Sequence, residues 1–344
     1  VTAIDRMAKL TKEDIVAFAD KYLKEDNYAV VYKKQGKDPN EKKMTKPEIT
    51  PIVSNRDVAS PFLTSIQENA VKPIEPVFLD FKKDMSQLTA KSDIPVLYKQ
   101  NTTNDLFQLI YVFDMGNNND KALGTAFDYL EYLGTSDMTP EELKSEFYRL
   151  ACTFYVSPGN ERTYVVLSGL NENMPAAMQL FEKLLADAQV NKEAYDNLVG
   201  DILKARADAK LNQGQNFSRL MNYAMYGPKS PATNLLTEAE LASMNPQELV
   251  DRIHNQNNYK HRILYYGPSS SKDLLATIDQ YHQVPATLKD IPAGNEFSYL
   301  ETPATKVLVA PYEAKQIYMA QISNLDKKYD PAIEPTRELY NEYF

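Results

Sequence analysis

Residues Leu106-Phe-Gln-Leu-Ile-Tyr-Val-Phe113, followed by Leu123-Gly-Thr-Ala-Phe-Asp-Tyr-Leu-Glu-Tyr-Leu-Gly-Thr135, decide the fold of this chain. The first stretch is a tight apolar cluster, too short for a membrane span, and it predicts a buried strand. The second belongs to a helical stretch that we expect over residues 121–133. Further strand patterns precede both, at residues 77–81, 86–90 and 96–99. Several consecutive strands before any helix favour an antiparallel α+β arrangement over alternating βαβ units.

Downstream, the same alternation of strands and helices continues. Thr139-Pro-Glu-Glu142 has the residues of a capping box with Pro in the first helical position, so a helix should begin there. Two strands are expected at residues 153–156 and 163–167, before a helix with an apolar face formed by Ala177, Phe181, Leu184, Leu185 and Ala188. We expect the longest helix at residues 192–211, with Gly214 ending it.

The beginning of the chain is echoed near residue 244. Leu10-Thr-Lys-Glu-Asp-Ile-Val16 predicts a helix, capped by Thr11 and Asp14, and a strand follows at residues 28–32. Met244-Asn-Pro-Gln-Glu-Leu-Val250 and a strand at residues 262–266 repeat that scheme. A second echo comes at the end, where strand patterns at residues 307–310 and 317–322 precede a helix over residues 331–344. The chain therefore reads as the end of one repeat, one complete repeat and the opening of a third.

A proline-rich stretch separates the first repeat from the second. It contains six of the chain's 20 prolines, namely Pro39, Pro47, Pro51, Pro61, Pro73 and Pro76. Its composition is that of an extended linker. We divide the chain into the end of a preceding domain (1–36), a linker (37–76), a complete domain (77–285) and the beginning of a truncated following domain (286–344).

Composition excludes several classes of protein. The 344 residues carry a net charge of -9, which argues against a nucleic-acid or anionic-membrane surface. The single cysteine, Cys152, excludes an internal disulfide and a cysteine-based zinc site. No apolar run is long enough for a transmembrane segment, and the first residues do not resemble a targeting segment. We expect the chain to begin inside a longer protein or after a processed end.

Leu123 to Thr135, followed by Ser168-Gly-Leu-Asn-Glu-Asn-Met174 and a long helix rich in Lys, Ala and Asp, resembles a domain of the pitrilysin/insulysin (inverted zincin) family of zinc metallopeptidases. The helix-then-strand closings at residues 10–32 and 244–266 are similar to the ends of that family's domains. The resemblance implies four homologous α+β domains, each a mainly antiparallel sheet with helices on one side, in two halves that close over a peptide. The chain would then hold the end of domain two, the linker, domain three and the start of domain four.

The zinc motif of that family, His-x-x-Glu-His on a helix, is missing from this chain. Aligning the family helix on Gly124-Thr-Ala puts Phe127, Leu130 and Glu131 at the three positions. Aligning it on Gly134-Thr135 instead puts Thr125, Asp128 and Tyr129 there. We therefore predict no catalytic residue, no metal ligand and no cofactor in this chain, with zinc expected in the parent protein. The residues that bind substrate are not identified.

Other reactive side chains have plainer interpretations. His254, His261 and His282 form no pair one helical turn apart, so surface or capping roles are expected. Cys152 fits a small core residue better than a nucleophile, because no base lies near it in the sequence. Gly267-Pro-Ser-Ser-Ser-Lys272 lacks the spacing of a phosphate loop, which favours serine capping of a helix from Ser271. The 23 tyrosines could line a peptide-holding wall or pack in the core with bonded hydroxyls.

The resemblance implies that the parent protein is a zinc-dependent endopeptidase. This chain would form part of the wall of its chamber, would be inactive alone, and would meet a peptide or unfolded protein substrate together with the missing catalytic half. The alternative is an assembly subunit of the same fold without peptidase activity. A His-x-x-Glu-His upstream of Val1 in the parent reading frame would separate the two. Bacterial members of the family suggest a periplasmic or cell-envelope location.

Overall fold

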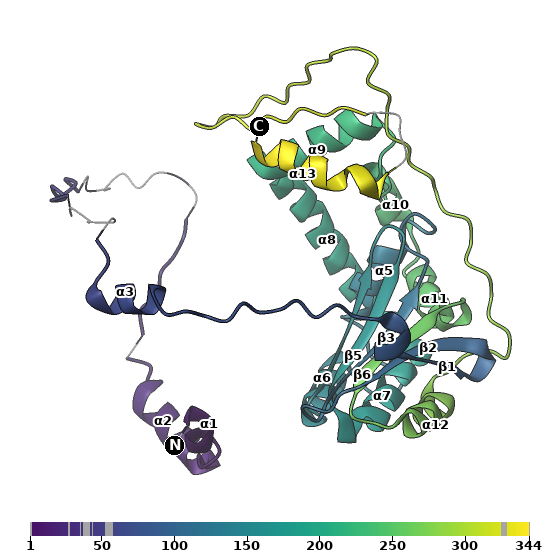
Figure 1. Ribbon diagram of the computed structural model, residues 1–344. Helices are drawn as coiled ribbons and strands as arrows, with labels where there is room; N and C mark the ends of the chain where they lie inside the picture. Colours follow the sequence, from purple (N-terminus) through teal and green to yellow (C-terminus); the bar gives the residue numbers. More distant parts are fainter. Residues whose placement is uncertain are drawn as a thin grey trace. The chain divides into compact units, whose positions relative to one another are not determined.

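The computed structural model describes residues 2–26, 28–34, 36, 42, 44–51, 58–324 and 329–343 (Figure 1). The chain divides into two compact units, Val1–Glu75 and Pro76–Phe344.

The second unit is built on a six-stranded sheet with the strand order β1-β2-β6-β3-β5-β4. Four of its five strand pairs are antiparallel, and β2 and β6 run parallel. The predicted α+β class with a mainly antiparallel sheet is confirmed. The strands are β1 (Ser86–Ala90), β2 (Ile94–Gln100), β3 (Leu106–Phe113), β4 (Cys152–Pro158), β5 (Thr163–Leu170) and β6 (Arg262–Gly267).

Strand β6 occupies the middle of the sheet, although it comes last in the sequence. Its Ile263 lies opposite Val96 of β2 on one side and Tyr111 of β3 on the other. Alternate residues of β6 face opposite sides of the sheet, and Ile263 and Tyr265 on the helix side are buried. Within the described residues, β6 is the strand that pairs with both halves of the sheet, β1-β2 and β3-β5-β4.

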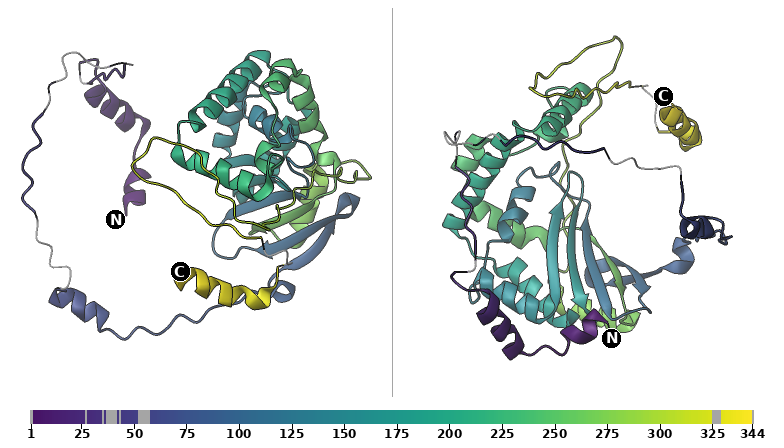
Figure 2. Two further views of the ribbon diagram at one scale, coloured as in Figure 1. Left: turned by 90° about the horizontal axis from the view of Figure 1, so that it is seen from above. Right: turned by 90° about the vertical axis from the view of Figure 1, so that its left-hand side faces the viewer.

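Helices gather on one face of this sheet, as Figures 1 and 2 show. Most of them bury apolar side chains against the sheet or against a neighbouring helix. They are α5 (Leu123–Leu130), α6 (Pro140–Arg149), α7 (Met174–Asp187), α8 (Lys192–Ala209), α9 (Gln213–Tyr226), α10 (Glu238–Ser243), α11 (Gln247–Asn255) and α12 (Ser271–Tyr281).

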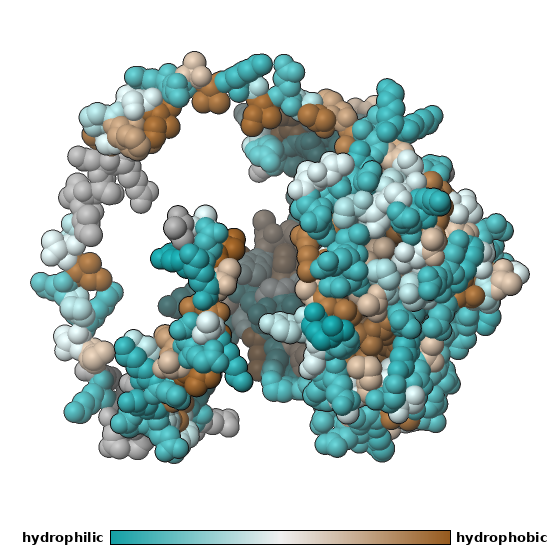
Figure 3. All heavy atoms as spheres, turned by 90° about the horizontal axis from the view of Figure 1, so that it is seen from below, coloured by the Kyte–Doolittle hydropathy of each residue, from teal (hydrophilic) through white to brown (hydrophobic). Residues whose placement is uncertain are grey.

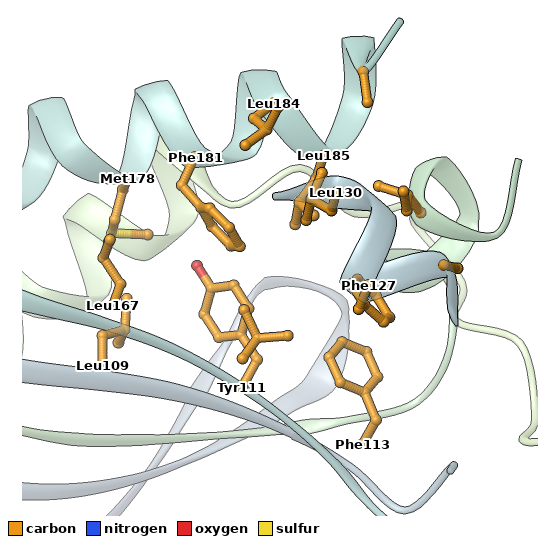
Figure 4. Close-up of a cluster of buried hydrophobic side chains, with 14 of the residues drawn as sticks. Leu109, Tyr111, Phe113, Phe127, Leu130, Leu167, Met178, Phe181, Leu184 and Leu185 are labelled. Carbon is orange, nitrogen blue, oxygen red and sulfur yellow. The ribbon is translucent and has the colours of Figure 1, made fainter. Parts of the chain in front are cut away.

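The core lies between the sheet and helices α5 and α7 (Figure 4). Leu109, Tyr111 and Phe113 of β3 point from the sheet toward the helices. Phe127 and Leu130 of α5 and Phe181, Leu184 and Leu185 of α7 point back at them, and all are nearly fully buried. At about 25 cal/mol per Å² of apolar surface, this contact is the main force that holds α5 and α7 on the sheet.

Some expected elements of the second unit are different in the structure. Residues 77–81 form no strand; Asp80 instead caps a single helical turn, α4 (Phe81–Asp84). Gly214 does not end the long helix but lies in the first turn of α9, which Asn212 caps. The strands expected at residues 307–310 and 317–322 do not form. The last helix is α13 (Glu334–Tyr343), preceded by the short 3-10 turn Pro331–Ile333.

The first unit contains α1 (Ala3–Met7), α2 (Lys12–Tyr22) and α3 (Pro61–Gln67). The predicted box of Thr11 and Asp14 caps α2, but no strand forms at residues 28–32. Helix α3, capped by Ser60, was not predicted within the linker, and Pro39 of that linker lies outside the described residues. These helices bury no side chain: Ile15 is 62% and Phe18 is 61% exposed. The space-filling view shows exposed apolar side chains among hydrophilic ones (Figure 3).

Candidate functional site

The helix that would hold the zinc motif is α5, and its residues point in different directions. Phe127 and Leu130 are 3% and 2% exposed in the core, whereas Glu131 follows the helix on the surface. In the other alignment Asp128 is exposed and Tyr129 is fully buried. Phenylalanine and leucine offer no donor atom to zinc, and neither set of three can converge on one ion. The residues at these positions do not fit a zinc site.

Metal ligands are not clustered elsewhere in the part of the chain that the structure describes. There, no group of three or more His, Cys, Asp or Glu side chains is placed to hold a metal ion. Within the same ranges, no helix is both long and apolar enough to cross a membrane.

A pair of buried tyrosines stands where α5 meets α8. The Tyr129 hydroxyl donates to the carbonyl of Asn191 at 2.6 Å and accepts from the backbone N–H of the same residue at 2.8 Å. The Tyr129 and Tyr195 rings meet edge to face, 5.8 Å apart, and the Tyr195 hydroxyl donates to the Leu241 carbonyl. Burial raises the pKa of both phenols, so both remain neutral. This part of α5 is a structural junction.

Two of the three histidines are not where we expected them. His254 has the expected role near a helix end, since its Nε2 is 3.1 Å from the carbonyl of Ala188, the residue after α7. The expectation of surface or capping roles is wrong for His261 and His282, which are 7% and 0% exposed. Both rings lie in the interior because each finds hydrogen-bond partners there.

The partners of these rings converge on Glu182 of α7, which is 1% exposed. His282 Nδ1 lies 2.6 Å from Glu182 Oε1, and His282 Nε2 lies 2.8 Å from His261 Nε2. Tyr111 donates to Oε1 at 3.0 Å, and Asn257 Nδ2 donates to Oε2 at 2.9 Å. We call these five residues, Tyr111, Glu182, Asn257, His261 and His282, the Glu182 cluster.

The electrostatics of the Glu182 cluster favour a neutral His261. Burial, and then the positive charge that His282 can carry, lower the pKa of His261 to about 4, although the Tyr259 carbonyl acts in the opposite direction. Burial and the Glu182 carboxylate raise the pKa of Tyr111 well above its usual value. The cluster has no exposed nucleophile, so it does not resemble a catalytic centre.

One feature of the sequence points to the Glu182 cluster. Glu182 falls on the apolar face of α7, one turn after Met178 and one turn before Leu185. A carboxylate in such a stripe needs buried partners. Its partners come from residues far away in the sequence, so the pattern of α7 alone cannot name them.

The other candidates have structural roles, as expected. Cys152 is 2% exposed, and burial raises the pKa of its thiol, so the prediction of a core residue is confirmed. The Ser270 hydroxyl accepts from the backbone N–H of Asp273 and caps α12, which confirms serine capping of the helix from Ser271.

Tyrosines occupy both of the settings that we considered. Tyr111, Tyr129, Tyr195 and Tyr265 are buried and their hydroxyls are bonded, which fits core packing. Tyr155, Tyr164 and Tyr266 are 53%, 38% and 45% exposed on β4, β5 and β6. Tyr164 also lines a polar hollow of about 850 Å³ beside Asp114, Arg162 and Tyr226. A peptide-holding role for the exposed tyrosines remains a prediction.

Comparison with solved structures places the fold among peptidase domains. The chain is similar to the periplasmic protease PqqL from Escherichia coli, with a TM-score of 0.57 and 15% identity over 89% of this chain and 32% of that one. It is also similar to a peptidase M16 inactive domain from Pseudomonas fluorescens, with a TM-score of 0.52 and 16% identity over 62% of this chain and 54% of that one. A third similar structure is the ferredoxin protease FusC in complex with Arabidopsis ferredoxin, with a TM-score of 0.55 and 12% identity over 85% of this chain and 30% of that one.

The chain thus spans about a third to a half of the length of these proteins. No family model matches the sequence, and no curated protein matches it. At such low identity the likeness establishes the fold, a peptidase M16-like domain.

Proposed function

We propose that this chain is a non-catalytic part of a zinc-dependent endopeptidase of the pitrilysin/insulysin type, consisting of its linker and third domain. The observation that carries the proposal is α5. The sequence resemblance assigns α5 to the position of the family's zinc helix, and Phe127 and Leu130 fill the core there. The likeness to a peptidase M16 inactive domain supports the same conclusion.

In this role the chain contributes surface and support, and the chemistry belongs to the missing catalytic half. The exposed tyrosines on β4, β5 and β6 offer apolar area with a polar tip, which suits the wall of a chamber that holds a peptide or an unfolded protein. The zinc ion would be bound by the parent protein outside this chain. A location in the bacterial periplasm or envelope is supported by the fold likeness to a periplasmic protease.

The alternative is an assembly subunit of the same fold that has lost peptidase activity throughout. The same observation at α5 is equally compatible with it, because a subunit without activity lacks the motif in every domain. The reading frame upstream of Val1 separates the two functions: His-x-x-Glu-His in a domain of this fold supports the endopeptidase, and its absence supports the subunit.

A biochemical test uses two proteins, the purified chain of residues 1–344 and its full-length parent. Each is incubated with a library of unstructured peptides, with zinc and with a chelator. We expect zinc-dependent cleavage by the parent and none by the chain. Zinc-dependent cleavage by the chain alone would refute a non-catalytic role. A parent without cleavage, despite tight binding of the same peptides, would favour the subunit.

A further inference from the structure

Three hydrogen bonds connect the Tyr259 carbonyl, His261, His282 and Glu182 in a row. We call the space between the two heavy atoms of each bond a gap, and each gap needs one proton. His261 Nδ1 lies 2.7 Å from the Tyr259 carbonyl, which can only accept, so this nitrogen must carry a hydrogen. The gap between the two Nε2 atoms is 2.8 Å and that between His282 Nδ1 and Glu182 Oε1 is 2.6 Å. Two lone pairs facing each other at such distances would repel, so one proton lies in each gap.

Three protons on one carboxyl and two imidazole groups make the chain of groups neutral. They could be arranged as a carboxylate beside a charged His282, or as a carboxylic acid beside a neutral His282. In both arrangements His261 is neutral and accepts from His282. The total is the same because each gap holds one proton: the Tyr259 carbonyl requires the one on His261 Nδ1, and the proton between His282 and Glu182 can sit on either group.

An unfolded chain holds fewer protons on these groups above neutral pH. At pH 8 a solvent-exposed imidazole keeps one proton and a solvent-exposed carboxyl group keeps none, so only about two protons remain. We propose that the Glu182 cluster is a buried proton-binding site, which takes up one proton when the chain folds above about pH 7 and thereby couples folding to pH.

The groups that face this site come from every element around it. They are Tyr111 and Phe113 of β3, Glu182 of α7, His254 of α11, Asn257 of the 3-10 turn after α11, Tyr259 and His261 before β6, and His282 and Gln283 after α12. Within the described ranges, no Lys or Arg and no second carboxylate is hydrogen-bonded to Glu182 or to the two rings. The extra proton is therefore the ion that balances the buried carboxylate.

Proton uptake would stabilise one particular attachment. Glu182 Oε2 also accepts from the backbone N–H of Gln283 at 3.0 Å, where the chain leaves α12. The site thus fastens the segment from Asn257 to Gln283, which contains the central strand β6, to α7 and β3. Loss of the proton would leave a lone pair facing a lone pair, or a buried carboxylate without a counter-charge, and would weaken this attachment.

The sign of the pH effect follows from the proton count. Above pH 7 the folded state binds about one proton more than the unfolded state, so stability must fall as pH rises. One proton corresponds to about a tenfold increase in the unfolding equilibrium constant per pH unit. Cys152, whose ordinary pKa is 9.0, begins to titrate at the upper end of the range from pH 7 to 8.5, but it is present in every variant, so its contribution cancels when their curves are compared.

The test is urea unfolding of the full chain at several values of pH between 7 and 8.5, for the unaltered protein and for His261→Phe. In His261→Phe, the proton that a neutral His282 already carries fills the gap to Glu182, so folding takes up no proton. The unfolding equilibrium constant of this variant should therefore lack the tenfold rise per pH unit, and its curve should diverge from that of the unaltered chain by about that amount. His254→Asn is the matched control, because it removes a histidine outside the three gaps, and its curve should run parallel to that of the unaltered chain. Parallel curves for the unaltered chain and His261→Phe would overturn the proposal.

A second measurement needs no variant and covers the case in which His261→Phe does not fold. Long-range nitrogen NMR of the unaltered chain at pH 8 reads the protonation of each ring nitrogen, and only three histidines have to be assigned. We expect a hydrogen on His261 Nδ1 and on His282 Nε2. Finding both Nε2 atoms without a hydrogen would show that the site has not bound its proton and would refute the proposal.

Discussion

The Tyr129 hydroxyl bonds both backbone groups of one residue, Asn191: it donates to the carbonyl at 2.6 Å and accepts from the N–H at 2.8 Å. The Asn191 side chain in turn caps α8 by accepting from the backbone N–H of Ala194. A single phenol on α5 therefore positions the residue at which α8 begins.

Replacing this phenol by Tyr129→Phe should destabilise the chain by about 1–3 kcal/mol, because two backbone groups of Asn191 lose the hydroxyl that bonds them in a part-buried position. Tyr132→Phe, three residues away and 45% exposed, is the matched control and should change the free energy of unfolding by less than about 0.5 kcal/mol. Urea denaturation measures both. Equal effects of the two substitutions would contradict a specific role for the Tyr129 hydroxyl.

The core position of Phe127 predicts a large effect of its removal. Phe127→Ala should cost about 3–5 kcal/mol in the free energy of unfolding, measured in urea, since it leaves a cavity between α5 and the sheet. Glu131→Ala, on the exposed end of the same helix, should cost less than about 0.5 kcal/mol.

Writing the family motif into α5 with Phe127→His, Leu130→Glu and Glu131→His should unfold the chain rather than create a zinc site. The first two changes place polar groups in an apolar core without partners. Circular dichroism and zinc titration calorimetry check this outcome. A folded triple variant that binds zinc tightly would show that the core at α5 can be remade as a metal site.

The lowered pKa of His261 predicts that the chain loses stability in acid. Its pKa is about 4 in the folded chain and about 6.5 when unfolded, so the unfolded state binds more protons between these values. Stability due to His261 is complete above about pH 6.5 and is lost as pH falls toward 4. Proton NMR should give its ring a midpoint near 4. A midpoint near 6.5 would show that the ring is open to solvent.

Glu240 should titrate far below an ordinary glutamate, with a pKa of about 2 instead of 4.5. The Lys121 ammonium is the main cause, and the Thr237 backbone N–H and hydroxyl add to it. The contribution of Glu240 to stability is therefore present above about pH 4.5 and disappears as pH falls toward 2. Lys121→Met should raise the Glu240 pKa, but not fully, because Thr237 still donates. Carboxyl carbon NMR measures the titration of Glu240. An unchanged midpoint in Lys121→Met would exclude the ion pair as the cause of the lowered pKa.

The expected end of the complete domain, residue 285, can be tested with two shorter chains, 77–285 and 77–295. The longer one keeps the pairing of Lys289 N–H with the Asn258 carbonyl and of Lys260 N–H with the Lys289 carbonyl. It also keeps the bond from Asn295 N–H to the Asn118 carbonyl. At about 0.5–1.5 kcal/mol each, these bonds should make 77–295 more stable by about 2–4 kcal/mol. Equal stability in urea would leave the boundary at 285.

Local chemistry in the sequence predicted most of the elements that are held by their own residues. The bounds of β1 and β3 agree with the predicted ranges, because each carries a strand pattern that meets partners on the sheet. Thr139 and Glu142 predicted the start of α6, since a capping box needs only residues three apart.

The failures concern elements that depend on distant partners. Residues 77–81 and 307–310 are as apolar as a strand, but neither stretch finds a neighbouring strand, and propensity alone does not form one. Gly214 favours the end of a helix in the sequence, whereas in the structure the Asn212 side chain caps a new helix, α9, in whose first turn Gly214 lies. The parallel pairing of β2 with β6, and the meeting of Glu182 with His282, join residues that no local pattern connects.

The position of β6 also determines when the sheet can be completed during synthesis. A ribosome releases β1 to β5 long before residues 262–267, and until then the two halves of the sheet, β1-β2 and β3-β5-β4, each present an unpaired edge. Strands of other molecules can pair with such exposed edges of a nascent chain. The sheet therefore stays open to such pairing until β6 is released and completes it.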